Sequence, residues 1–138
     1  AIVVSNHGGR QLDGTVSSIS MLPKIVDAVY GRDIEIHIDS GIRSGQDILR
    51  AVALGANAAY IGRPYLYGLG AYGRKGVHRV LEILRSEFDT TMALVGERDV
   101  EHVGPHILES IPQDWLPSSP QSSSRPDDRE VNSNTACY

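Results

Sequence analysis

Short apolar runs alternate with longer amphipathic stretches along most of the chain. The runs at 1–4, 34–38 and 57–62 are brief and apolar, which is typical of buried β-strands. Between them, apolar residues at intervals of three and four predict helices over 16–30 and 46–54. Strands separated by helices of this length predict βαβ units and a parallel sheet, so the fold class is α/β.

The second half of the chain divides into a helical part and a polar tail. A short helical turn is expected at 66–69, and apolar positions at helical spacing predict a long helix over 76–95. Residues 117–138 are rich in Ser, Pro, Asp and Asn and hold almost nothing that a core could bury. We therefore expect a structured unit over 1–116, with Trp115 as its last anchored side chain, and a disordered tail over 117–138.

The composition excludes several classes of protein. The 138 residues carry a formal net charge of −4, which offers no basic face for nucleic acid. No apolar run approaches the roughly 18 residues that span a bilayer. One cysteine excludes a disulfide framework and a cysteine zinc site, and no histidine has metal-ligand spacing. We expect a cytoplasmic protein, which could also lie peripherally at a membrane, without a metal.

Unusual residues follow all three predicted strands at their C-terminal ends. The segments are VVSNHGGRQLD at 3–13, IHIDSGIRSG at 36–45 and YIGRP at 60–64. Ligands of parallel α/β proteins bind at that edge of the sheet. Three such segments in succession therefore indicate one shared ligand.

The second and third segments have the composition of a phosphate site. Ser40 and Gly41 leave the backbone open to an anion, Arg43 adds a cation, and the start of a helix follows. Gly62 and Arg63 repeat this combination on the next strand. Either segment alone is more simply a glycine turn with an exposed arginine, but the pair on adjacent strands favours phosphate binding.

The first segment places His7 and Arg10 on either side of two glycines. Histidine can take up a proton near neutral pH, and the planar fork of arginine binds a carboxylate through two hydrogen bonds. In isolation these residues are more simply a turn. At the same sheet edge as a phosphate site, they indicate a base beside a carboxylate clamp. A further histidine, His37, should point opposite to Ile36 and Ile38 and lie between the sheet and a helix.

Three stretches of the chain resemble a known family: SNHGGRQLDG at 5–14, DSGIRSGQDILRAVALGANAAYIGRPYLYGL at 39–69 and GVHRVLEILRSEFDTTMALVG at 76–96. All three are similar to the C-terminal part of the FMN-dependent α-hydroxy-acid dehydrogenases and oxidases, which include L-lactate dehydrogenases, glycolate oxidases and mandelate dehydrogenases. The resemblance covers about residues 1–115 in unbroken order. It implies the sixth to eighth strands, with their helices, of a (β/α)₈ TIM barrel. The apolar first strand has no polar lead-in, so we also expect the chain to begin inside a larger domain.

The resemblance also implies roles for individual residues. His7 matches the catalytic base and Arg10 the arginine that holds the substrate carboxylate, so both would contact the substrate. His7 would remove a proton from an L-2-hydroxy acid, with L-lactate the best single candidate, while reducing equivalents pass to the flavin. The cofactor FMN would be bound by two segments, the second at its phosphate: Asp39, Ser40, Gly41, Ile42 and Arg43, and then Gly62 and Arg63.

Other properties stay open at the level of the sequence. Ser40 stands where many oxidases of the family carry Gly, which favours a dehydrogenase. The electron acceptor could be a quinone, a cytochrome or O₂, and family members are often homotetramers. The family's first five strands supply its lysine near the flavin and the aspartate that orients the histidine, so we expect this chain alone to be inactive.

Two alternatives to this enzyme are kept. One is a non-catalytic, truncated remnant that serves as a subunit or interaction module, for which the extended polar tail would be suited. The other is a different FMN- or phosphate-binding barrel, such as an FMN-linked isomerase. The turn that carries both His7 and Arg10 speaks against this second alternative.

Overall fold

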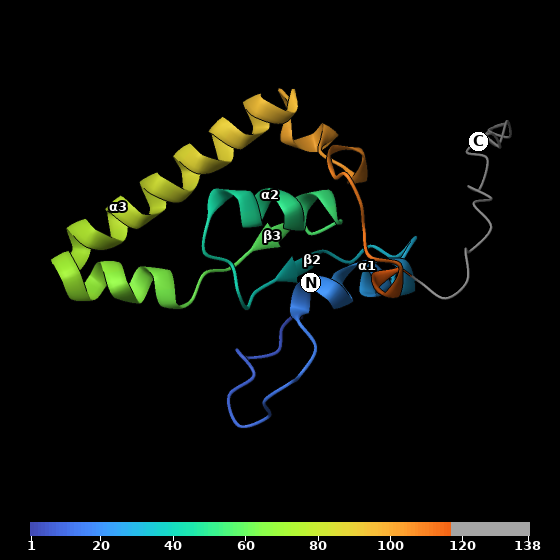
Figure 1. The fold of residues 1–138 in the computed structure, drawn as a ribbon, viewed down its shortest axis with the longest axis horizontal. Coiled ribbons are helices and arrows are strands. Elements are labelled where there is room, and N and C mark those ends of the chain that lie inside the picture. Colours follow the sequence, from blue (N-terminus) through green and yellow to red (C-terminus); the bar gives the residue numbers. More distant parts are fainter. Residues whose placement is uncertain (117–138) are drawn as a thin grey trace, which may run out of the picture.

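The computed structural model describes residues 1–116, which contain a three-stranded parallel sheet (Figure 1). Its strands are β1 (Ile2–Val4), β2 (Ile36–Ile38) and β3 (Ala58–Ala59), and they lie side by side in chain order. In the parallel register, Val3 pairs with His37, and His37 pairs with Ala58. The C-terminal ends of all three strands therefore lie at one edge of the sheet, as the sequence predicts.

Two helices connect the strands. α1 (Ser18–Ala28) joins β1 to β2, and α2 (Gly45–Ala53) joins β2 to β3. α1 begins later than its apolar periodicity predicts because Ser17 caps it, accepting a hydrogen bond from the backbone N–H of Ser20. Ser44 caps α2 in the same way and forms a reciprocal capping box with Asp47.

The third helix is sharply bent (Figure 1). α3 (Arg63–Val95) contains a break at Tyr72 and Gly73, whose backbone angles are not helical. Its two arms approach each other so closely beside the break that a Cβ on Gly68 would lie 2.6 Å from the carbonyl oxygen of Gly76. The break separates the two helical segments that the sequence predicts, and the first arm begins earlier than residue 66.

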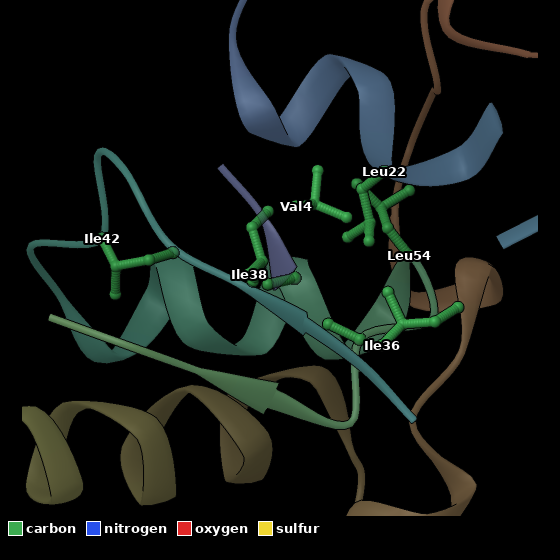
Figure 2. Close-up of a cluster of buried hydrophobic side chains, with 8 residues drawn as sticks. Val4, Leu22, Ile36, Ile38, Ile42 and Leu54 are labelled. Atoms are coloured by element: carbon green, nitrogen blue, oxygen red, sulfur yellow. The ribbon is translucent and has the colours of Figure 1, made fainter. Parts of the chain in front are cut away.

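One face of the sheet is buried against α1 and α2. The strands contribute Val4, Ile36 and Ile38 to an apolar cluster that also contains Leu22 of α1 and Leu54 after α2 (Figure 2). Burial of a Leu or Ile side chain contributes about 1.5–3 kcal/mol each. This cluster therefore fixes the position of both helices on the sheet.

The other face of the sheet carries no helix among residues 1–116. Val3 is 51% exposed on β1, and Tyr60, which follows β3, is 49% exposed. The described residues thus form two layers, a sheet and its helices, and the helices lie on the same side.

The expectation that His37 lies between the sheet and a helix is wrong. Ile36 and Ile38 take the helix side, and because alternate residues of a strand point to opposite faces, His37 lies on the open side. There its Nδ1 is 2.9 Å from the hydroxyl of Tyr60, and its Nε2 is 3.1 Å from the carboxylate of Glu35.

After α3 the chain returns to α1 through three short 3₁₀ helices, η1 (Val100–His102), η2 (Pro105–Ile107) and η3 (Gln113–Trp115). Trp115 packs against the apolar cluster. The expected tail over 117–138 lies outside the described residues. None of the helices within 1–116 is long and apolar enough to cross a membrane.

Candidate functional site

A pocket of about 390 Å³ at the C-terminal edge of the sheet collects residues from all three strand ends. It brings together most of the site residues predicted from the sequence, and Arg10 is the exception. The residues in the pocket are His7 after β1, then Asp39, Ser40, Gly41, Ile42 and Arg43 after β2, and Gly62 and Arg63 after β3.

The loop after β1 has an unusual backbone. His7, Gly8, Gly9 and Arg10 all have positive φ angles, of 53°, 77°, 77° and 42°. Glycine adopts this left-handed region freely, but for His7 and Arg10 it costs on the order of 1–3 kcal/mol each. Backbone strain of this kind is concentrated at functional sites, which makes the loop a candidate for chemistry.

Neighbouring side chains orient His7. Its Nδ1 is 3.0 Å from Ser5 Oγ, and its backbone N–H donates to the same oxygen over 3.1 Å. Asn6 accepts a hydrogen bond from the N–H of Gly8 and donates to the carbonyl of Val16, which ties the start of the loop to its end. In the tautomer whose Nδ1–H donates to Ser5 Oγ, Nε2 is the ring nitrogen that can accept a proton.

Arg10 lies apart from the other predicted residues. Its side chain is exposed, it makes no hydrogen bond or ion pair within residues 1–116, and it does not line the pocket. In Figure 1 the blue loop between β1 and α1 extends away from the sheet. The described residues therefore bring His7, but not Arg10, to the other candidates.

The loop after β2 offers free backbone donors. Ser40 and Gly41 have φ angles of 69° and 96°, and their N–H groups make no hydrogen bond within residues 1–116. Ser40 Oγ donates to the Asp39 carboxylate over 2.6 Å. Two adjacent N–H groups can bind an anion, and Arg43 lines the same pocket.

The start of α2 is already occupied by carboxylates from the chain itself. Asp47 accepts hydrogen bonds from the N–H groups of Arg43 and Ser44, both over 3.1 Å, and Glu87 of α3 accepts from Gly45 over 2.8 Å. These three N–H groups are therefore not free to bind a phosphate within residues 1–116. The loop before the helix and Arg43 line the pocket and are available to a ligand.

The start of α3 is free to take an anion. Gly62 precedes the helix without a side-chain cap, and Arg63 is the first of its 33 residues. A Cβ on Gly8 would lie 4.0 Å from Arg63 Nη2, so this guanidinium lies beside the first loop. An uncapped helix start with an arginine is well suited to bind phosphate.

A larger pocket of about 520 Å³ lies behind the loop after β2, between α1, α2 and the C-terminal segment. Its walls are mainly apolar, with Ile19, Leu54 and Trp115 among them. It contains none of His7, Arg43 and Arg63, so the smaller pocket is the candidate site.

Two residues near the candidate site are given no role by the sequence interpretation. Tyr60 lines the pocket beside Gly62, and its position at the end of the third apolar run was the available signal. Ser18 contacts the loop after β2, but a serine at the start of a helix gives no such indication in the sequence.

Comparison with families and curated proteins gives consistent matches. The model of the family described as FMN-dependent dehydrogenase matches residues 1–110. L-lactate dehydrogenase of Haemophilus influenzae is 53% identical over 110 residues, which are 80% of this chain and 29% of that protein. 2-Hydroxyacid oxidase 1 of Mus musculus is 49% identical over 111 residues, or 80% of this chain and 30% of that protein.

Solved structures match in the same region. A mandelate oxidase mutant with a monooxide FMN adduct is similar with a TM-score of 0.67 and 52% identity, covering 72% of this chain and 31% of that one. A flavocytochrome b2 mutant with sulfite bound has a TM-score of 0.71 and 39% identity, covering 76% and 28%. These neighbours are FMN-dependent TIM-barrel enzymes, and the three-stranded sheet corresponds to part of such a barrel, which confirms the expected fold class.

The chain spans about 30% of the length of the curated relatives that it matches. Within that span, the family match includes all three strands and the loops that line the pocket. The chain belongs to the family of FMN-dependent dehydrogenases.

Proposed function

We propose that this chain forms part of the active site of an FMN-dependent enzyme that oxidises an L-2-hydroxy acid to the 2-oxo acid. The observation that carries the proposal is the convergence of His7, the 39–43 loop and Arg63 on one pocket. The names of the relatives, an L-lactate dehydrogenase and a 2-hydroxyacid oxidase, support this substrate class. L-Lactate is the first substrate to test.

The groups in the pocket fit the anionic end of FMN. The N–H groups of Ser40 and Gly41 have no protein partner within 1–116, the α3 start has no side-chain cap, and Arg43 and Arg63 line the same space. Asp39, Ile42 and Gly62 complete this wall. When bound, FMN supplies the acceptor for the two electrons that leave the substrate.

His7 would act as the base. Oxidation of a 2-hydroxy acid to a 2-oxo acid removes two electrons and two protons. Nε2 of His7 would accept one proton, and the other would pass with the two electrons to FMN. This role needs the tautomer in which Nδ1–H donates to Ser5 Oγ, because only that tautomer leaves Nε2 without a hydrogen. Arg10 would bind the substrate carboxylate through its planar fork, and because it lies outside the pocket, this role requires the first loop to move or to receive further support.

A chimeric enzyme tests the proposal. Residues 1–110 of this chain replace the matching segment of the Haemophilus L-lactate dehydrogenase. We expect the chimera to retain FMN, as measured by flavin absorbance, and to oxidise L-lactate but not D-lactate. A folded, flavin-loaded chimera that oxidises neither L-lactate, glycolate nor mandelate would contradict the proposed reaction.

The same chimera examines the electron acceptor and the alternatives. If Ser40 marks a dehydrogenase, a quinone or cytochrome acceptor should support turnover much better than O₂. A chimera that folds but takes up no FMN would contradict the cofactor assignment and favour the non-catalytic alternative.

A further inference from the structure

Ser18 is the buried polar side chain of the described residues, with 3% of its surface exposed. It is the first residue of α1, and its hydroxyl lies 2.6 Å from the carbonyl oxygen of Asp39 and 3.0 Å from that of Ser40. A serine hydroxyl has one hydrogen, which is shared here between two carbonyls of the loop after β2. The start of α1 is thereby joined to the loop that lines the pocket.

These contacts fix the direction of two peptide groups. The described chain has no cis peptide bond, so the C=O of each residue points opposite to the N–H of the next. Holding the carbonyls of Asp39 and Ser40 toward α1 therefore turns the N–H groups of Ser40 and Gly41 away from it. Ser40 has a left-handed φ of 69°, an arrangement that costs a non-glycine residue free energy and needs support.

We propose that Ser18 is a positioning residue for the cofactor, because its hydroxyl holds the loop so that the N–H groups of Ser40 and Gly41 face the anion. The identity of that anion, the FMN phosphate, rests on the proposed function. Ser18 contacts neither the pocket nor His7, and it acts only through the two carbonyls.

The same serine links the two loops of the site. Asn6, at the start of the His7 loop, donates to the carbonyl of Val16 over 3.1 Å, and Ser17 then caps α1. Ser18 follows directly and bonds the second loop. A displacement of the α1 start would therefore move both loops together.

The first test uses the whole chain without flavin. Ser18→Ala removes the donor, and Ser18→Thr keeps a hydroxyl. Ser20→Ala is the matched control, because the Ser20 hydroxyl bonds only Ser17, the residue that caps α1. We expect Ser18→Ala to change the backbone NMR chemical shifts of Ser40 and Gly41 and the coupling constant that reports the φ angle of Ser40. Ser18→Thr and Ser20→Ala should leave them close to the parent values.

The outcome of this test does not depend on FMN. Equal spectra of the 39–41 loop in Ser18→Ala and the parent would overturn the inference. It would also be overturned if the parent chain itself showed Ser40 outside the left-handed region, or if Ser20→Ala changed the loop as much. If Ser18→Thr does not fold, the comparison between the two alanine variants still decides.

The second test uses the chimeric enzyme. Ser18→Ala should weaken FMN affinity about tenfold, the ratio that corresponds to one ordinary hydrogen bond, while KM for L-lactate at saturating FMN changes less than about twofold. Ser20→Ala should change neither. FMN affinity equal to the parent's would overturn the inference, whereas a parent chimera that binds no FMN would contradict the proposed function and leave the NMR result to decide on Ser18.

Discussion

The loops after β1 and β2 both reach the candidate pocket, but the described residues hold them to different degrees. The second loop is tied on two sides, by Ser18 to its carbonyls and by Asp47 to the N–H groups at its exit. Glu87 adds a bond from α3 to Gly45. The first loop is tied mainly across its base by Asn6, and Arg10 has no side-chain partner within residues 1–116.

This difference separates a preorganised part of the site from an adaptable one. The second loop is already held in place, so it does not have to be ordered when an anion binds. More of the interaction energy therefore remains as binding affinity. The first loop, which carries His7 and Arg10, would gain its final geometry from the bound substrate or from further protein contacts. The two loops should consequently respond differently to mutation.

The largest expected effect belongs to the chemistry of the first loop. In the chimera, His7→Ala should lower kcat by a factor on the order of 10² to 10⁴, because the base is removed. FMN content should stay at the parent level. Steady-state kinetics with L-lactate and flavin absorbance measure the two quantities. Activity that returned on addition of FMN would show that His7 serves the turn and not the proton transfer.

Gly45→Ala tests how firmly the second loop is anchored. A Cβ at this position would lie 2.5 Å from the carbonyl oxygen of Leu84, a backbone atom that cannot turn aside. We expect α2 and α3 to separate, with a loss of about 1–3 kcal/mol or more in the free energy of unfolding.

Gly70→Ala is the matched control for Gly45→Ala. Gly70 lies in α3 with open space around it, and an alanine there should stabilise the helix by about 0.5–1 kcal/mol. Thermal unfolding of both variants gives the comparison. Equal effects at the two positions would contradict the close contact between α2 and α3.

A pair of arginine variants compares the loops through the cofactor. Arg63→Ala should weaken FMN affinity about 10- to 100-fold in the chimera, the range for a hydrogen bond to a charged group. Arg10→Ala should leave FMN affinity within about twofold and raise KM for L-lactate instead. Flavin fluorescence titration and initial rates separate the two effects. The reverse pattern would exchange the roles assigned to the two arginines.

The smallest expected effect concerns the cap beside the second loop. Ser44→Ala should cost about 1 kcal/mol in the free energy of unfolding, because the N–H of Asp47 loses its acceptor. Ser17→Ala removes the corresponding cap of α1 and should cost a similar amount. Urea unfolding measures both. An unchanged stability of Ser44→Ala would mean that the capping box does not hold this end of the loop.

The convergence of the strand ends could be predicted from the sequence. Parallel strands end at one edge of the sheet, so residues after each of them meet there, as His7, Ser40 and Arg63 do. The break in α3 was also indicated, because the two apolar patterns at 66–69 and 76–95 do not join. The apolar periodicity of a helix, and the point where it is interrupted, can be seen in the local sequence alone.

Other features depend on contacts that no local pattern encodes. Glu87 fills the start of α2 from 42 residues away, and nothing in its surroundings distinguishes it from other exposed acids of α3. Strand alternation defines two faces around His37 but does not say which one the helices cover. The position of Arg10 follows from a run of left-handed residues, which the sequence allows but does not require.

The C-terminal segment has a consequence for how this protein can be observed. The chain contains a single tryptophan, and Trp115 sits in η3, where it meets α1 and the apolar cluster. Indole fluorescence shifts to longer wavelength when water replaces such a contact. Because α1 also carries Ser18, the emission of Trp115 becomes an intrinsic optical signal for movements that begin at the loop after β2.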